Sequence, residues 1–179
     1  TGFNHDGLFL AHLHSPGRHR YSGRPDDRHA VVFDMRQALE QNSDIMSAQE
    51  TFRSNYLFSH NILIADSEKV AVLEQPGGEF GRLRTDRSRL RNELAWDRPE
   101  RIAVVNCFAL YGYSNTITSR DYRRWYRFRK MAKNSRPGHL SEVIKIMTDK
   151  NGSIFNVLTS QSVVFIPHDK RLFLYTVPV

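Results

Sequence analysis

The clearest structural signal in the sequence is the stretch NILIADSEKVAVLE (residues 61–74). It holds two short apolar runs, residues 62–65 and 70–73, joined by four polar residues. Apolar runs of this length, bounded by turn-forming residues, are typical of β-strands, and the short connection predicts a hairpin. Neither run alternates cleanly between apolar and polar residues, which indicates that both faces of the hairpin are covered.

Further elements are expected on both sides of this hairpin. Strands are predicted at residues 8–13, 102–105, 162–166 and 171–177. Helices are predicted at residues 29–41, 46–52, 119–133 and 140–147, and residues 82–99 read as polar and irregular. Because helices come in pairs between groups of strands, the order predicts an α+β fold with antiparallel sheet layered against helix pairs.

Apolar spacing indicates which helix faces are buried. In the first helix, Val32, Met35 and Leu39 recur at intervals of three and four, which predicts one buried face. The second helix follows Asn42, Ser43 and Asp44, all suitable N-cap residues. In the third helix, the candidate packing positions are Tyr122, Trp125, Tyr126 and Met131.

Composition sets broad limits on the protein. The 179 residues, 40% of them hydrophobic, suffice for one domain with a sizeable core. No uninterrupted apolar run is long enough to span a bilayer, so no membrane partner is expected. The single cysteine, Cys107, excludes an internal disulfide. Nothing in the sequence specifies a compartment or a cofactor, and homo-oligomerisation stays open.

The net charge of +7 raises the question of an acidic partner. Arginines supply most of this charge and gather at residues 82–101 and 120–136. Such clusters can bind phosphates, and aromatic residues lie between arginines in the second cluster, so a nucleic-acid or polyanion binding module is an alternative function. A charged helix surface that keeps the protein soluble gives the same pattern. We favour the interpretation that these charges keep the helix surface soluble, so nucleic acid is not the expected partner.

Three segments, taken together, resemble the N-terminal-nucleophile (Ntn) linear-amide hydrolases. Residues 2–8, GFNHDGL, are similar to the Gly-x-Asn-Glu-x-Gly-Leu turn of that family. Residues 61–66, closed by residues 72–74, resemble its Asn-x-Leu-Leu-Ala-Asp and Val-x-Glu hairpin. Residues 104–108, VVNCF, resemble its strand ending in Thr-Asn-x-Phe. The family includes penicillin V acylase, bile-salt hydrolase and acyl-coenzyme A:isopenicillin N acyltransferase, and the sequence resembles the last of these branches most.

This resemblance implies a four-layer αββα sandwich, with residues 1–179 as the C-terminal portion of one domain that is incomplete at its N-terminus. It implies cleavage or transfer at a linear amide bond of a small acyl-amide substrate, without a cofactor. In the family, an N-terminal cysteine exposed by autoproteolysis attacks the carbonyl, and its own α-amine acts as the base. That nucleophile lies upstream of the Gly-x-Asn turn, so we expect it in a preceding segment.

The resemblance also assigns three site residues. Asn4 and Asn106 correspond to family asparagines that help to form the oxyanion hole, where amide N–H groups donate to the developing negative oxygen. Arg124, followed by Trp125, fits the family pattern Ser-x-x-Arg-aromatic, although Asp121 replaces the serine. Arg120 and Arg123 are close rivals for this position.

Several residues with reactive side chains are weaker candidates. Cys107 follows an apolar run, where a buried and inert thiol is common. Thr1 aligns with an internal position of the family turn, so it is not expected to be the nucleophile. His12 and His14 lie on one face of the predicted strand, but no third ligand is fixed nearby, which disfavours a metal site. A non-catalytic relative that keeps the sandwich as a binding scaffold is a further alternative.

Overall fold

The structure is a computed structural model that describes residues 1–15, 29–54, 56, 58–97, 100–134, 139–150, 154 and 161–176. Its strands are β1 (Gly2–Phe3), β2 (Phe9–His14), β3 (His60–Ala65), β4 (Val70–Gln75), β5 (Arg82–Arg84), β6 (Gln161–Ile166) and β7 (Arg171–Thr176). Its helices are α1 (Val31–Gln41), α2 (Ile45–Thr51), the 3₁₀ helix η2 (Asn92–Leu94), α3 (Ser119–Asn134) and α4 (Leu140–Met147). The chain therefore has the predicted α+β composition with antiparallel sheets.

One five-stranded antiparallel sheet has the strand order β1-β2-β3-β4-β5. The hairpin predicted from residues 61–74 is confirmed, with Ala65 opposite Val70 and His60 opposite Gln75. Its strands are mostly buried, as the lack of alternation indicated. The two predicted C-terminal strands are confirmed as β6 and β7, which form a separate two-stranded sheet, although the last residue expected in β7, Val177, lies outside the described residues.

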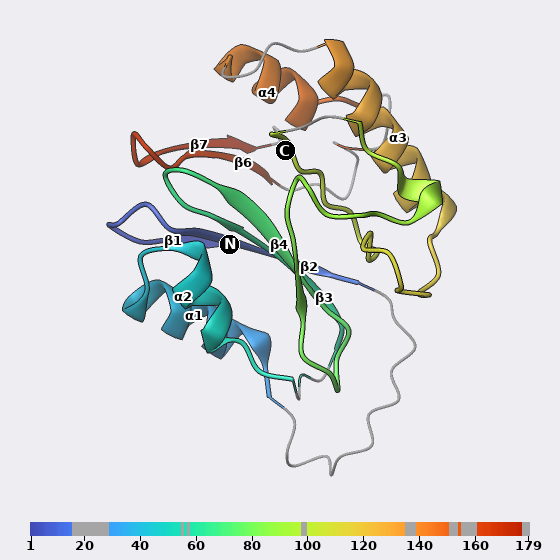
Figure 1. Cartoon of the computed structure of the whole chain (residues 1–179). Helices are drawn as coiled ribbons and strands as arrows, with labels where there is room; N and C mark the ends of the chain where they lie inside the picture. Colours follow the sequence, from blue (N-terminus) through green and yellow to red (C-terminus); the bar gives the residue numbers. More distant parts are fainter. Residues whose placement is uncertain are drawn as a thin grey trace.

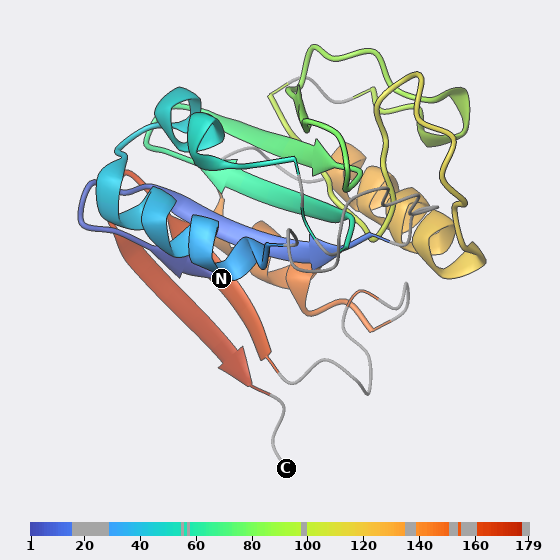
Figure 2. The same cartoon turned by 90° about the horizontal axis from the view of Figure 1, so that it is seen from below.

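Helices α1 and α2 cover one face of the five-stranded sheet (Figures 1 and 2). Their buried side chains and those of β2, β3 and β4 form one apolar cluster. Asp44 caps α2, because its carboxylate accepts hydrogen bonds from the backbone N–H groups of Met46 and Ser47. The predicted α1 face is partly wrong: Met35 is buried, but Val32 is 57% exposed, and Val31 and Ala38 are buried on the same helix.

The opposite face of the sheet carries the β6–β7 pair, with α3 and α4 beyond it (Figure 1). The Phe165 ring stacks on Phe3 and Phe9, with ring centroids 4.8 and 5.2 Å apart. Helix α3 packs through Trp125, which is buried against Trp96 and the segment 103–109. The prediction for Tyr122 and Tyr126 is wrong, because both rings are about half exposed or more.

The strand predicted at residues 102–105 does not form. This segment makes only an isolated bridge, between Val105 and Cys107, and the carbonyls of Ala103 and Val105 accept hydrogen bonds from buried side chains of the sheet, described below. The stretch predicted to be irregular, residues 82–99, contains the short strand β5 and the helix η2.

Candidate functional site

Asn106 lies at the tip of a tight turn. The backbone N–H of Cys107 donates to the carbonyl of Val105 at 2.8 Å, which closes a three-residue γ-turn centred on Asn106. Only Glu100 and Lys170 have positive φ among the non-glycine residues described, so the turn at Asn106 is the common inverse form. The side chain of Asn106 therefore points away from the residues that flank it in the turn.

The buried side chain of Asn61, on β3, holds this turn in place through two hydrogen bonds. Its Nδ2 donates to the carbonyls of Val105 at 2.8 Å and Cys107 at 2.9 Å, the two residues that flank Asn106. A third, longer contact of 3.2 Å joins Nδ2 to the hydroxyl of Ser15. Asn61 is completely buried, and its Oδ1 has no hydrogen-bond partner among the described residues. The amide is thus oriented by the two carbonyls of the turn.

Two further buried polar side chains hold the rest of the segment. The carboxylate of Glu74, on β4, accepts hydrogen bonds from the backbone N–H groups of Ala109 and Leu110, at 3.0 Å each. The guanidinium of Arg84, on β5, donates to Glu74 at 2.6 Å and to the carbonyl of Ala103 at 2.8 Å. Consecutive strands β3, β4 and β5 thus each contribute one buried polar side chain to residues 103–110.

Glu74 and Arg84 form a buried ion pair, with side chains 0% and 3% exposed. Burial lowers the pKa of the Arg84 guanidinium, and the neighbouring carboxylate of Glu74 opposes this shift. Because the ordinary pKa of arginine is far above neutral, Arg84 stays charged. A buried pair whose remaining hydrogen-bonding groups are also satisfied holds the segment in one defined position.

The side chain of Asn106 is held between two partners. Its Nδ2 donates to the carbonyl of His14, at the end of β2, over 2.7 Å. Its Oδ1 accepts from Arg124 of α3 at 3.4 Å. The guanidinium fixes the amide orientation, since an NH₂ group could not face it, and one N–H of Nδ2 remains for another acceptor. The structure thus brings together two predicted site residues, Asn106 and Arg124.

Asn4 uses its side chain within the turn between β1 and β2. Oδ1 accepts from the backbone N–H groups of Asp6 at 3.1 Å and Leu8 at 3.0 Å. Nδ2 donates to the carbonyls of Leu39 at 3.0 Å and Asn42 at 2.7 Å, at the end of α1. Asn4 therefore joins the β1–β2 turn to α1.

Asn4 and Asn106 lie at opposite ends of β2, contrary to the expectation that they act together. Asn4 precedes the strand, whereas Asn106 contacts His14, its last residue. The strand is six residues long, so its ends are roughly 17 Å apart. One oxyanion cannot contact side chains separated by this distance.

Neither Cys107 nor Thr1 has the surroundings of a nucleophile for this site. Cys107 is 2% exposed, and burial, together with the carboxylates of Asp121 and Glu74, raises the pKa of its thiol to about 12. A protonated, buried thiol is a poor nucleophile. Thr1 is exposed and adjoins Gly2, which pairs with Leu10, well before the end of β2 that Asn106 contacts.

The two histidines of β2 lie on the face that α1 and α2 cover. His12 Nε2 lies 2.6 Å from Nδ1 of His60, which makes a direct hydrogen bond and leaves no room for an ion between them. His14 packs edge-on against Phe58. The described residues contain no group of three or more His, Cys, Asp or Glu side chains that could hold a metal ion.

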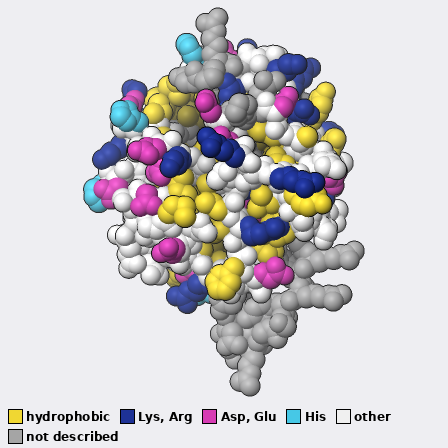
Figure 3. All heavy atoms as spheres, in the orientation of Figure 1, with side chains coloured by type: hydrophobic (Ala, Val, Ile, Leu, Met, Phe, Trp, Pro, Cys, Tyr) yellow, Lys and Arg dark blue, Asp and Glu magenta, His cyan; other side chains and the backbone are white. Residues whose placement is uncertain are grey.

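Three basic residues of α3, Arg124, Arg127 and Arg129, are engaged by side chains of other segments. Arg127 makes a bidentate pair with Asp149 at 2.7 and 2.8 Å, and Arg129 pairs with Asp97 at 3.1 Å. Arg120 and Arg123, the rivals of Arg124, are exposed, and Arg98 and Arg136 lie outside the described residues. On the face shown in Figure 3, Lys and Arg side chains alternate with Asp and Glu instead of forming a single basic area.

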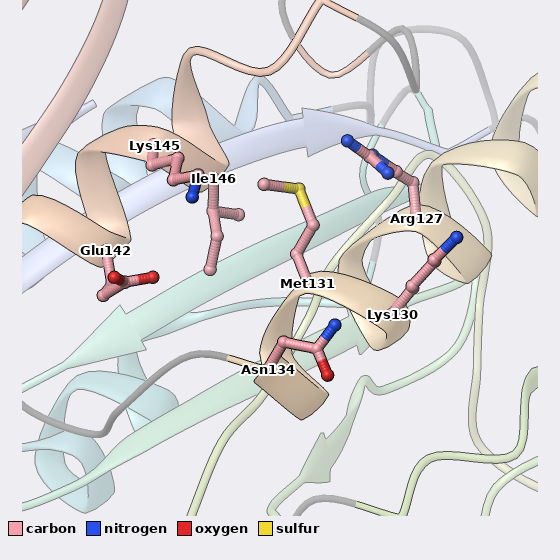
Figure 4. Close-up of a pocket in the computed structure, with 7 residues that line it drawn as sticks. All are labelled: Arg127, Lys130, Met131, Asn134, Glu142, Lys145 and Ile146. Atoms are coloured by element: carbon pink, nitrogen blue, oxygen red, sulfur yellow. The ribbon is translucent and has the colours of Figure 1, made fainter.

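A shallow depression of about 200 Å³ lies between α3 and α4 (Figure 4). Met131 and Ile146 point toward each other across it, and Lys130, Lys145 and Glu142 lie at its rim. The depression combines both charge signs and lies away from Asn106, so it adds nothing to the candidate site.

Asn61, Glu74 and Arg84 were not predicted as supporting residues. The available signal was their polarity: Asn61 begins and Glu74 ends the apolar hairpin, and a charged or amide side chain within buried strands requires a partner. The sequence did not identify that partner, because the hydrogen-bonding groups belong to the backbone of residues 103–110.

Across the described ranges, each helix is too short or too polar to cross a membrane. A comparison with protein-family models found no match, and a comparison with curated protein sequences found none either.

Proposed function

We propose that the chain is the C-terminal part of an Ntn linear-amide hydrolase or acyltransferase. The observation that carries this proposal is the arrangement of Asn106, whose side-chain amide is fixed between the His14 carbonyl and the Arg124 guanidinium at the tip of a clamped turn. A rigidly held amide donor is what stabilisation of a tetrahedral oxyanion requires.

Each residue then has a distinct role. The remaining Nδ2–H of Asn106 donates to the oxyanion, and Arg124 orients the amide through Oδ1. Asn61 acts as a positioning residue, because it holds the two carbonyls on either side of Asn106. Asn4 contributes by fixing the turn that leads into β2, not by direct contact with the substrate. The nucleophile is an N-terminal residue that this chain does not supply.

The finer fold assignment belongs to the same proposal. The arrangement of α1 and α2, the five-stranded sheet, the β6–β7 pair, and then α3 and α4 is compatible with four αββα layers (Figure 1). In this proposal, an upstream strand that carries the nucleophile completes the second sheet. The substrate is a small acyl amide, and water or a second amine accepts the acyl group.

The test uses the complete encoded reading frame, including whatever precedes Thr1. Purified protein is assayed for release of the amine from N-acyl amino acids and from penicillin V. Asn106→Ala should lower kcat by about 10²- to 10³-fold with little change in KM, as expected for loss of one oxyanion donor. Asn134→Ala, at the exposed end of α3, is the matched control and should leave kcat unchanged.

Two results would contradict the proposal. The 179-residue chain alone should not turn over any of these amides, so turnover that Thr1→Ala or Cys107→Ala abolishes would place the nucleophile within this chain. An upstream sequence without a Cys, Ser or Thr that can become N-terminal would instead support the non-catalytic scaffold.

A further inference from the structure

A second depression, of about 480 Å³, opens where β4 and β5 meet the segment after residue 107. Its volume is within the range of small-molecule sites. Its lining includes Phe80, Arg82, Phe108, Tyr113 and Asn115. These residues belong to none of the roles assigned above.

Aromatic rings form the floor and rim of this depression. Phe108 is buried, and its ring centroid lies 4.9 Å from that of Tyr113. The guanidinium of Arg82 stacks over the other ring of this pair, 3.9 Å from the centroid of Tyr113. Phe80 lines the same depression and is 77% exposed, so most of its ring is open to a ligand. A flat apolar group could cover part of this ring.

Asn115 presents a donor that the protein does not use. It is 8% exposed, and its Oδ1 accepts from Arg91 at 3.1 Å, which fixes the amide orientation. Arg91 also donates to the Asn115 carbonyl at 2.8 Å. The Nδ2 group is buried and has no acceptor among the described residues. Because Asn115 lines the depression, an oxygen bound there would satisfy this group.

Both charge signs are present at the site. Arg82 makes no ion pair within the described part of the chain. Its guanidinium lies over the Tyr113 ring, hydrogen-bonds the Tyr113 side chain, and contacts the Tyr111 carbonyl at 3.4 Å. Glu79, which is exposed, also lines the depression. A carboxylate would therefore meet Arg82 and Asn115, and an ammonium group would meet Glu79.

We propose that this depression binds an aromatic α-amino acid as its zwitterion. The carboxylate lies against Arg82 and Nδ2 of Asn115, the ammonium group faces Glu79, and the ring rests on Phe80. This site does not depend on the chemistry proposed at Asn106, whose side chain reaches β2 instead of the β4–β5 corner. It adds a small-molecule binding function to the chain.

The experiment titrates the ¹⁵N-labelled 179-residue chain with L-phenylalanine and follows amide signals by NMR. We expect saturable shifts at Gly112, Ser114 and the Asn115 side chain, with a Kd on the order of 1 mM for a ligand of this size. Signals of the Asn106 side chain should not move. Phenylacetate lacks the ammonium group, phenethylamine lacks the carboxylate, and L-alanine lacks the ring. Each should bind with a Kd at least about tenfold higher than that of L-phenylalanine.

Charge-neutral variants sharpen the assignment. Arg82→Gln and Glu79→Gln should each weaken L-phenylalanine binding by about tenfold. The matched controls Arg87→Gln and Glu68→Gln change exposed residues elsewhere and should leave the Kd unchanged. Because all four positions are exposed, the spectrum outside the site reports that each variant is folded.

The proposal would be overturned by an absence of saturable shifts at Gly112 and Asn115 up to roughly ten times the expected Kd. Shifts confined to other residues would overturn it as well. Equal binding of phenylacetate, or of phenethylamine, would also contradict it, because the zwitterion would then not be the ligand recognised.

Discussion

The two faces of the five-stranded sheet are held by different forces. On the face under α1 and α2, side chains such as Leu10, Ile62 and Ile64 form a continuous apolar cluster. On the opposite face, at the end of the sheet away from the stacked rings of Phe9 and Phe165, Asn61 and Glu74 point toward residues 103–110 and bind backbone groups at defined distances. Apolar burial has no preferred direction, whereas these hydrogen bonds fix both position and orientation.

The difference explains why the candidate site lies where it does. A residue that must present one N–H to an oxyanion requires a support accurate to a fraction of an ångström. Asn106 has such a support on the polar face, although its segment has no regular secondary structure. The apolar face contributes stability to the sheet, and the polar face uses that stable sheet to position a turn.

Removing the charge of Glu74 should have the largest effect on stability. Glu74→Gln leaves Arg84 charged and buried without its carboxylate partner, so we expect a loss of about 3–5 kcal/mol in the free energy of unfolding. Urea denaturation measures this loss, with exposed Glu68→Gln as the control that should change little. A loss below about 1 kcal/mol would show that the polar face is not held by this pair.

Removing the amide of Asn61 should have a smaller effect on stability but a specific one on Asn106. Asn61→Ala leaves the Val105 and Cys107 carbonyls without their donor, which should cost about 1–3 kcal/mol. We also expect the side-chain NH₂ signals of Asn106 to shift in NMR spectra and to exchange faster with solvent. Unchanged signals would contradict the positioning role of Asn61.

A conservative change on the apolar face should affect stability alone. Ile62 neighbours Asn61 on β3 but points to the α1–α2 side. Ile62→Val removes one methylene group and should cost about 0.5–1.5 kcal/mol without moving the Asn106 side-chain signals. If this variant disturbs Asn106 as much as Asn61→Ala does, the two faces are not independent.

The apolar face was the more predictable part of the fold. The hairpin of residues 61–74 and the helix α1 follow from apolar runs and their spacing, since burial of such runs is a local property of the sequence. Val32 was misassigned because the buried stripe of α1 passes through Val31, Asp34, Met35 and Ala38. One of these, Asp34, is polar, and its hydrogen bond from Tyr56 was not apparent from spacing.

The polar face was less predictable. Residues 102–105 look like a strand, but the carbonyls of Ala103 and Val105 accept hydrogen bonds from the side chains of Arg84 and Asn61 instead of from a neighbouring strand. The contact between Asn106 and Arg124 joins a turn to a helix 18 positions away, and only a resemblance placed both residues in one site. Periodicity does not report contacts of this kind, because the partners lie on different elements.

The smallest expected effect concerns His12, which lies at the polar end of the apolar face. Burial lowers its pKa, as do the positive charges of the N-terminus and His14, so the folded protein binds a proton there less readily than the unfolded chain. Stability should therefore be unaffected above about pH 6.5 and fall as the pH drops below this value. The His12 ring is hydrogen-bonded directly to the ring of His60.

The comparison of wild type with His12→Gln, by urea denaturation between about pH 7.5 and 5, isolates this contribution. Carboxylates with ordinary pKa values near 4 titrate mainly below this range, so the slope there reports histidines. The variant should lose part of the decline in stability that the wild type shows over this range. A steeper decline in His12→Gln would contradict this expectation. It would show that the folded state stabilises the protonated His12 ring, so that nearby charge, not burial, sets the direction of its pKa shift.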